Sequence, residues 1–324
     1  MTAYIIRRLI MGVIILLLVT MIVFLFMRLL PGDPLIVYMS GYDIQRMNRI
    51  GPEQYQAMLH QFGLDQPIAV QYYQWLSKIL QGDLGESIKL RENIATLMAE
   101  RMPRTAYIGF IAFIIGTSLG IAAGVVCALR RGTWMDNVAT LLANTGITIP
   151  VFGLGILLIY LFSYKLGWLP TSGWTSPFED FWLSTKQLIM PIICLSVGGM
   201  GGMCRLTRSC MLEVMRQDYV RTAWAKGLRE RVIVVRHQLK NAMIPIITVL
   251  GGAIGGILGG SVFIETVFAI PGMGRLMTNA VFDQDYQIVQ AGVLLFGGIV
   301  IFSNLVVDIL WAWLDPRIRY TGGG

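Results

Sequence analysis

Charged residues are scarce in this sequence: Asp, Glu, Lys and Arg make up 14% of its 324 residues. A soluble chain of average composition carries about 25%. Hydrophobic residues account for 55% and the mean hydropathy is +0.63, which excludes an ordinary soluble enzyme and favours a helical membrane protein. The net charge of +7 then indicates basic cytoplasmic loops rather than nucleic acid as a partner.

Histidine and cysteine are also rare, with two and four residues. The cysteines lie in or beside apolar segments and form no C-x-x-C pair; they are Cys127, Cys194, Cys204 and Cys210. We interpret them as small packing residues and expect neither a disulfide nor a metal site. The sequence contains no G-x-x-x-x-G-K-[ST] and no H-E-x-x-H, so we expect no enzyme activity and no cofactor in this chain.

Long apolar segments are present six times, which predicts an all-α membrane protein with six transmembrane helices. Their expected bounds are Leu9–Met27, Tyr107–Leu129, Val138–Leu166, Leu188–Met203, Ala242–Ile264 and Ile288–Val307. Pro150 is expected to kink the third segment, and Pro191 with the glycines that follow it to interrupt the fourth. Arg7 and Arg8 precede the first segment and no small-x-small cleavage site follows it, so it is interpreted as a retained helix rather than a signal peptide.

The loops between these segments predict the orientation. The segments on one side hold fifteen Lys and Arg residues, and the short loops on the other side hold three. The positive-inside rule then places both termini in the cytoplasm. We expect a cytoplasmic end and first helix (1–30), a long extracytoplasmic insert (31–103) and a core of five further transmembrane helices (104–321), and interpret Gly322–Gly324 as a remnant of recombinant expression.

The extracytoplasmic insert contains short periodic stretches. PGDP (Pro31–Pro34) must end the first helix, because two prolines and a glycine cannot continue it. Helical periodicity with an apolar face predicts short helices over Pro52–Phe62 and Pro67–Leu80. GDLGESI (Gly82–Ile88) predicts a turn followed by an extended piece.

Ionisable side chains are almost absent from the interiors of the six segments. Secondary transporters usually mark their route with intramembrane carboxylates or histidines and contain repeats, so this class is disfavoured. Soft polar residues are present instead, and Asn144, Thr145 and Thr148 are candidates for a solute pathway, with interhelical hydrogen bonding as the competing interpretation. Solute movement without a coupling ion would require an external ATPase.

Glycines recur at four-residue spacing in the fifth segment. GGAIGGILGG places Gly251, Gly255 and Gly259 in one row, a candidate helix-packing ridge. A row without side chains lets another helix approach closely. Tight packing within the chain and a helix that slides against a second subunit are equally supported.

The loop after the fourth segment is strongly basic: Arg205–Lys240 holds nine Lys and Arg against three Asp and Glu. We expect a helix over Glu213–Ala225, a stop at Gly227, and a second helix over Arg229–Lys240 that continues toward a stop or kink at Pro245. Small residues at such a bend leave backbone open to a cytoplasmic partner, whereas anionic lipid would explain only the charge. The candidate coupling residues are Tyr219, Arg221, Thr222, Ala223, Ala225, Lys226, Gly227 and Arg229.

This loop resembles the motif of bacterial ABC importer permeases, in which a glycine follows small residues and an N-A-x-x-P step opens the next span. DYVRTAWAKGL and RHQLKNAMIP are similar to the peptide and nickel branch of that family, with Trp224 where arginine is common. The usual opening Glu-Ala-Ala is replaced by Arg221, Thr222 and Ala223. Further blocks of resemblance cover nearly the whole chain: LPGDP, GDLGES, RLTRSCMLEVMRQDY, ETVFAIPGMGRL and DPRIRY.

The resemblance, strongest to the first permease subunit of dipeptide and oligopeptide importers, implies a type I importer fold and half of a heterodimeric channel in the bacterial inner membrane. It implies a second homologous permease, two cytoplasmic ATPases that use ATP and Mg, an extracytoplasmic solute-binding protein and membrane lipid as partners. Pro31–Pro103 and Glu265–Leu276 would meet the binding protein. Nickel or glutathione import and a non-transporting membrane scaffold remain open alternatives.

Overall fold

A computed structural model describes residues 2–29, 52–61, 65–87 and 89–314. Within these ranges the regular structure is helical, apart from an isolated antiparallel bridge between Glu86 and Asn93. The all-α prediction is therefore confirmed. The LPGDP and DPRIRY blocks and Gly322–Gly324 lie outside the described residues.

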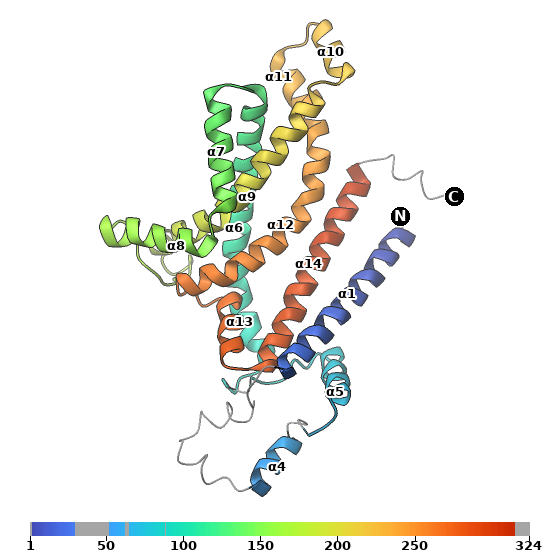
Figure 1. Ribbon diagram of the computed structural model, residues 1–324, viewed down its shortest axis with the longest axis vertical. Coiled ribbons are helices and arrows are strands. Elements are labelled where there is room, and N and C mark those ends of the chain that lie inside the picture. Colours follow the sequence, from blue (N-terminus) through green and yellow to red (C-terminus); the bar gives the residue numbers. More distant parts are fainter. Residues whose placement is uncertain (1, 30–51, 62–64, 88, 315–324) are drawn as a thin grey trace. The chain divides into compact units, whose positions relative to one another are not determined.

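The chain forms two compact units (Figure 1). One contains residues 7–104 and 271–299, and the other contains residues 105–270 together with residues 1–6 and 300–324. Three long helices cross from one range to the other, so α1, α6 and α14 contribute residues to both units.

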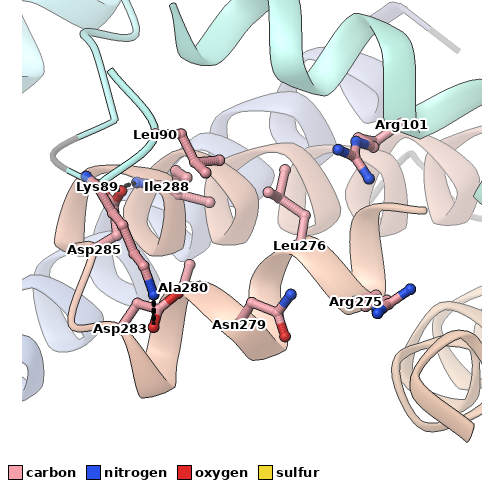
Figure 2. Close-up of a pocket in the computed structure, with 10 residues that line it drawn as sticks. All are labelled: Lys89, Leu90, Arg101, Arg275, Leu276, Asn279, Ala280, Asp283, Asp285 and Ile288. Atoms are coloured by element: carbon pink, nitrogen blue, oxygen red, sulfur yellow. Dashed lines mark hydrogen bonds and ion pairs between the residues drawn. The ribbon is translucent and has the colours of Figure 1, made fainter. Parts of the chain in front are cut away.

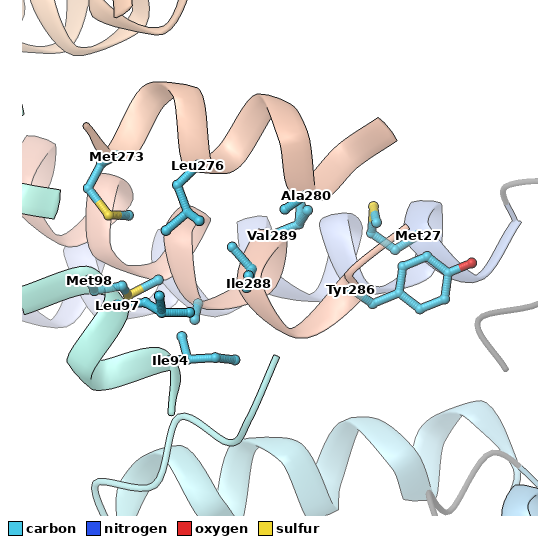
Figure 3. Close-up of a cluster of buried hydrophobic side chains, with 11 residues drawn as sticks. Met27, Ile94, Leu97, Met98, Met273, Leu276, Ala280, Tyr286, Ile288 and Val289 are labelled. Atoms are coloured by element: carbon cyan, nitrogen blue, oxygen red, sulfur yellow. The ribbon is translucent and has the colours of Figure 1, made fainter. Parts of the chain in front are cut away.

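The unit of residues 7–104 and 271–299 contains the short helices of the insert. Its elements are α1 (Thr2–Leu29), α4 (Pro52–Gln61), α5 (Ile68–Leu80), the start of α6 (Ile94–Leu129), α13 (Met273–Phe282) and the start of α14 (Tyr286–Leu314). Both helices predicted in the insert are thus present, in α4 and α5. Buried Ile94, Met98, Met273 and Ile288 belong to one apolar cluster that joins α6, α13 and α14 (Figure 3).

The unit of residues 105–270 is built around α9. Its elements are the remainder of α6, α7 (Trp134–Thr148), α8 (Val151–Leu158), the π-helical segment η1 (Ile159–Lys165), α9 (Phe181–Val214), α10 (Asp218–Ala225), α11 (Glu230–Val232), the π-helical segment η2 (Ile233–Leu239) and α12 (Lys240–Val267). Helix α9 packs against both α7 and α12. Buried Leu188, Met190 and Leu195 of α9 share an apolar cluster with Ile264 and Phe268.

Candidate membrane spans number four single helices and two bent pairs in the described residues. The single helices are Ile6–Leu29, Ile94–Leu129, Phe181–Val214 and Tyr286–Val307, and the pairs are Trp134–Thr148 with Val151–Lys165 and Glu230–Leu250 with Gly252–Val267. Counting each pair once gives the six predicted spans. All of these candidate spans are helical, so each can satisfy its backbone hydrogen bonds within the membrane.

The third span is broken at Pro150, as predicted, but the break is far sharper than a kink. Its two halves meet at 104°. The residue before a proline is driven out of the α region, and Ile149 accordingly takes φ −69° and ψ 125°. Pro150 itself takes φ −59° and ψ 128°, so two consecutive non-helical residues turn α8 away from the axis of α7.

Two prolines have less effect than expected. Helix α9 runs through Pro191 without interruption, so the predicted break there is wrong. Helix α12 likewise continues through Pro245, and its 47° bend falls at Gly251–Gly252 instead. Helix α6 begins at Ile94, well before the expected Tyr107. Neighbouring helices can satisfy the backbone groups that a proline frees, which a sequence does not display.

A second glycine row, in α6, makes close backbone contact with α9. Cβ atoms added at Gly116, Gly120 and Gly124 of α6 would lie 2.9, 2.7 and 2.6 Å from carbonyl oxygens of α9. By contrast, a Cβ at Gly255 of α12 would meet Val300 at an ordinary 3.5 Å, and one at Gly259 would meet nothing within 4 Å. In the described residues, the α6 row therefore packs tightly on α9. Gly255 and Gly259 of the α12 row make no such close approach.

Candidate functional site

The turn of the basic loop requires a glycine. Helix α10 ends at Ala225, and Gly227 follows with φ +71°. The N–H of Gly227 donates to Trp224 O at 2.9 Å, and the N–H of Leu228 donates to Ala223 O at 3.4 Å. This pair of bonds is the Schellman motif, which satisfies the last carbonyls of the helix. The predicted stop at Gly227 is confirmed.

A small core holds the two arms of this loop together. We call residues 218–235 the coupling hairpin. Val220 and Ala223 of α10 pack on Ile233, and all three are buried. The Asn241 side chain donates to Tyr219 Oη at 3.1 Å and to His237 O at 2.7 Å. The hairpin is therefore fixed to the start of α12, and Figure 1 shows α10 and α11 beyond the ends of α9 and α12.

The predicted helix over Glu213–Ala225 is wrong, because the chain turns within it. Helix α9 ends at Val214 and α10 begins at Asp218. The intervening turn brings the apolar side chains of α10 back onto η2. A straight helix would leave those side chains exposed, and their burial favours the turn.

The coupling hairpin exposes both apolar and basic side chains. Trp224 is 51% exposed and Val235 is 55% exposed, and Leu228 and Val232 are also exposed. Exposed basic residues border them: Arg221, Lys226, Arg229 and Arg231. A group of exposed large apolar residues with a polar rim is typical of a protein-binding surface.

The candidate coupling residues divide into two groups in the structure. Tyr219, Arg221, Thr222, Ala225, Lys226, Gly227 and Arg229 are exposed. Ala223 is only 4% exposed, and its small side chain serves the packing of α10 on Ile233. Trp224 and Leu228 were not among the candidates, although large apolar residues in a basic loop are a signal that sequence alone provides.

The candidate pathway residues lie on one exposed stretch of α7. The Thr145 hydroxyl donates to Leu141 O at 2.9 Å, and the Thr148 hydroxyl donates to Asn144 O at 3.1 Å. Both hydroxyls donate within α7, and the choice between solute contact and interhelical hydrogen bonding stays a prediction. Asn144 lines a cavity of about 250 Å³ between α7 and α9. The other lining residues are Thr140, Ala143, Cys204, Arg205, Arg208, Ser209 and Leu212.

A buried ion pair beside this cavity was not predicted. Asp136 of α7 is 3% exposed, and its carboxylate accepts from Arg208 Nε at 2.7 Å and from Arg208 Nη2 at 2.8 Å. It also accepts from the N–H of Gly132 at 3.0 Å. Bidentate geometry with an additional donor is what allows a buried charge pair to be tolerated. The pair fixes the start of α7 to α9.

The GDLGES block lies beside a second cavity, in the unit of residues 7–104 and 271–299 (Figure 2). Ser87 Oγ donates to Asp285 Oδ2 at 2.5 Å, the N–H of Lys89 donates to the same oxygen at 3.2 Å, and the Lys89 ammonium pairs with Asp283. The cavity measures about 290 Å³. It is lined by Lys89, Leu90, Arg101, Arg275, Leu276, Asn279, Ala280, Asp283, Asp285 and Ile288.

This second cavity joins regions that are distant in the sequence. Three of its lining residues are cationic and two are acidic, and Figure 2 shows the Arg101 and Arg275 guanidinium groups at the end away from Lys89. Part of the insert and part of Glu265–Leu276, the two regions expected to meet a binding protein, thus line one charged depression.

The four cysteines are free and buried. Among the described residues, no group of three or more His, Cys, Asp or Glu side chains is placed to hold a metal ion.

Comparison with known proteins agrees with this architecture. The family described as binding-protein-dependent transport system inner membrane component matches residues 120–320, and the N-terminal family of the same membrane components matches residues 1–109. The chain belongs to this family. It is therefore a multi-pass inner membrane protein and a transporter subunit.

Curated relatives of this permease match it from end to end. A candidate peptide permease of Brucella suis biovar 1 (strain 1330) is 39% identical over 99% of this chain and 100% of its own length. A candidate peptide transport system permease of Brucella abortus (strain 2308) and the glutathione transport system permease protein GsiC of Salmonella choleraesuis (strain SC-B67) are each 41% identical, with the same coverage.

A solved structure shows that the permease fold is shared more widely. An inward-facing structure of the MetNI methionine ABC transporter matches with a TM-score of 0.56 at 18% identity, over 68% of this chain and 97% of that chain. The expected fold of an ABC importer membrane subunit is confirmed by this likeness.

Proposed function

We propose that this chain is the permease subunit of an ATP-driven peptide importer, and that the coupling hairpin is the surface that receives its ATPase. The observation that carries the proposal is the exposed face of Trp224, Leu228 and Val232 on a hairpin held by its own small core. The relatives named for peptides and for glutathione support a peptide solute, since glutathione is itself a small peptide.

The assembly that we propose has a second homologous permease, two ABC ATPases that bind ATP and Mg, and an extracytoplasmic solute-binding protein. Both termini and the coupling hairpin face the cytoplasm, as the distribution of Lys and Arg favours. ATPase closure would move the hairpin and, through it, α9 and α12. A change between two discrete packings of these helices would give alternating access.

The charged cavity at Lys89, Arg101 and Arg275 is our candidate contact for the binding protein. Exposed charges at such a rim steer association and fix register more than they add affinity. The open glycine face of α12, represented by Gly256 and Gly259, supports contact with the second permease, since a Cβ at either position meets nothing within 4 Å.

The proposal is tested in liposomes that contain this chain with its partner permease and ATPases. ATP hydrolysis is measured with the binding protein empty, loaded with a dipeptide mixture, loaded with glutathione, or supplied with nickel. We expect stimulation by the dipeptide-loaded protein and its loss in Trp224→Ala combined with Leu228→Ala. Stimulation by nickel alone would show that the importer carries nickel and not peptides. Absence of any complex with an ATPase would favour the scaffold alternative.

A further inference from the structure

Helix α5 (Ile68–Leu80) of the insert is attached to the membrane-spanning helix α1. Tyr72 Oη and Thr20 Oγ1 share a hydrogen bond at 3.1 Å, and Tyr72 Oη also donates to Leu17 O at 3.3 Å. The Phe24 ring lies 5.3 Å from the Tyr72 ring and 6.2 Å from the Trp75 ring, measured between centroids. One row of α5 is therefore fixed to α1 by both polar and aromatic contacts.

The depth of this attachment follows from the length of α1. Thr20 precedes the end of the helix at Leu29 by nine residues, which is about 13 Å along an α-helix. The candidate span of α1 is Ile6–Leu29, and its 18-residue apolar window has a mean hydropathy of 3.2. Helix α5 thus contacts α1 within the apolar span and not beyond its end.

A second row of α5 is apolar and largely uncovered by the described residues, with Leu76 half-buried and its other members exposed. Ala69, Tyr73, Leu76 and Leu80 recur at the spacing of one helix face. Tyr73 is 72% exposed and Leu80 is 81% exposed, and no residue of α5 is buried. A soluble surface would rarely present a tyrosine and a leucine so fully on one stripe.

The remaining row of α5 is polar, which completes a pattern with three faces. Gln74, Lys78 and Gln81 are exposed on the side away from the second apolar row. Near the attachment, α1 also exposes Leu18, Met21, Ile22 and Leu25. Helix α1 is long and apolar enough to cross a membrane, so exposed apolar side chains near the attachment of α5 are available to lipid.

We propose that α5 is an interfacial helix of the outer leaflet, with Tyr73, Leu76 and Leu80 among the lipids and with Gln74 and Lys78 toward water. Tyrosine is favoured at this depth because its ring is apolar and its hydroxyl is polar, and Lys78 can extend its ammonium to the headgroups. The insert is then held at the bilayer surface from two sides, by α1 and by lipid. The choice of leaflet rests on the proposed orientation, whereas the insertion does not.

The test uses the complete transporter in phosphatidylcholine nanodiscs. Single cysteines replace Tyr73 or Leu80 on the apolar row and Gln74 or Lys78 on the polar row, and each is labelled with the fluorophore NBD. The unsubstituted protein gives the background from its four buried thiols. Quenching by 5-doxyl lipid is compared with quenching by aqueous iodide.

We expect the ratio of lipid to iodide quenching to be at least twofold higher at positions 73 and 80 than at 74 and 78. Two positions on each row keep the test valid if one variant does not fold. Equal iodide quenching at all four positions would overturn the proposal. Protection of positions 73 and 80 that arises only when the solute-binding protein is added would also overturn it, because a protein would then cover this row. Sidedness is read in intact cells: reaction of the unlabelled cysteine at position 78 with a membrane-impermeant thiol reagent only after permeabilisation would keep the insertion and refute the proposed orientation.

Discussion

Replacement of Gly227 by valine tests the backbone conformation of the coupling hairpin without adding a steric clash. Gly227 has φ +71°, and a Cβ added there would meet nothing within 4 Å. The new side chain thus causes no clash, and the cost is that of holding a residue with a Cβ in the left-handed region. That cost is about 1–2 kcal/mol, and a β-branched residue falls at the upper end of this range.

A penalty of this size falls on a small element. The core of the hairpin consists of three buried side chains, Val220, Ala223 and Ile233. A loss of about 1–2 kcal/mol changes an equilibrium by a factor of about 5–30. We therefore expect Gly227→Val to weaken ATPase binding to the permease by that factor, measured as the dissociation constant in detergent or nanodiscs.

Gly82 supplies the matched control. It has φ +84° and likewise no atom within 4 Å of an added Cβ, but it lies in the turn after α5. Gly82→Val carries the same backbone strain and should leave ATPase affinity at the wild-type value. Equal loss of affinity in both variants, or normal affinity in Gly227→Val, would refute the assignment of the hairpin as the ATPase-binding element.

Three further predictions concern packing and charge. Gly201→Ala should lower the melting temperature, because its Cβ would collide with a backbone carbonyl of α7. The Cβ of the adjacent variant Gly202→Ala would meet no atom within 4 Å, so this variant should be neutral or stabilising by up to about 1 kcal/mol. A lower melting temperature for Gly202→Ala than for Gly201→Ala would contradict this prediction. Asp136→Asn leaves the guanidinium that it pairs with uncompensated and should cost about 3 kcal/mol in denaturant unfolding, and an unchanged midpoint would contradict a structural role. The Asp65 carboxylate accepts from His60 Nδ1 at 2.7 Å and raises the His60 pKa above 6.5. The contribution of this pair to folding stability is therefore present below pH 6.5 and is lost as the pH rises through the raised pKa. Asp65→Asn should lower the His60 pKa toward 6.5 in an NMR titration.

The sequence predicted the features that depend on one residue and its neighbours. Pro150 excludes the α region for Ile149, and the break appears there. Gly227 follows the helical stretch of α10 and takes the left-handed conformation that ends it. In both cases the local backbone chemistry decides the conformation whatever packs around it.

Features that depend on which helices become neighbours could not be predicted. Four-residue glycine spacing occurs in α6, at Gly116, Gly120 and Gly124, and also in α12, but tight backbone contact within the chain is found for the α6 row. Asp136 and Arg208 are 72 positions apart, and no local pattern pairs them. The turn between Val214 and Asp218 likewise depends on the apolar partner that it reaches in η2.

The glycine row of α6 has a mechanical consequence. Side chains between two helices can change rotamer and allow sliding, but backbone in direct contact with backbone has no such compliance. With α6 against α9 in this way, and α7 locked to α9 by a buried ion pair, these three helices should move as one stiff lever. Force applied to the hairpin at the end of α9 would then reach the far end of α9, and the flexing would fall to α12, where a Cβ added at Gly256 or Gly259 meets no described atom within 4 Å.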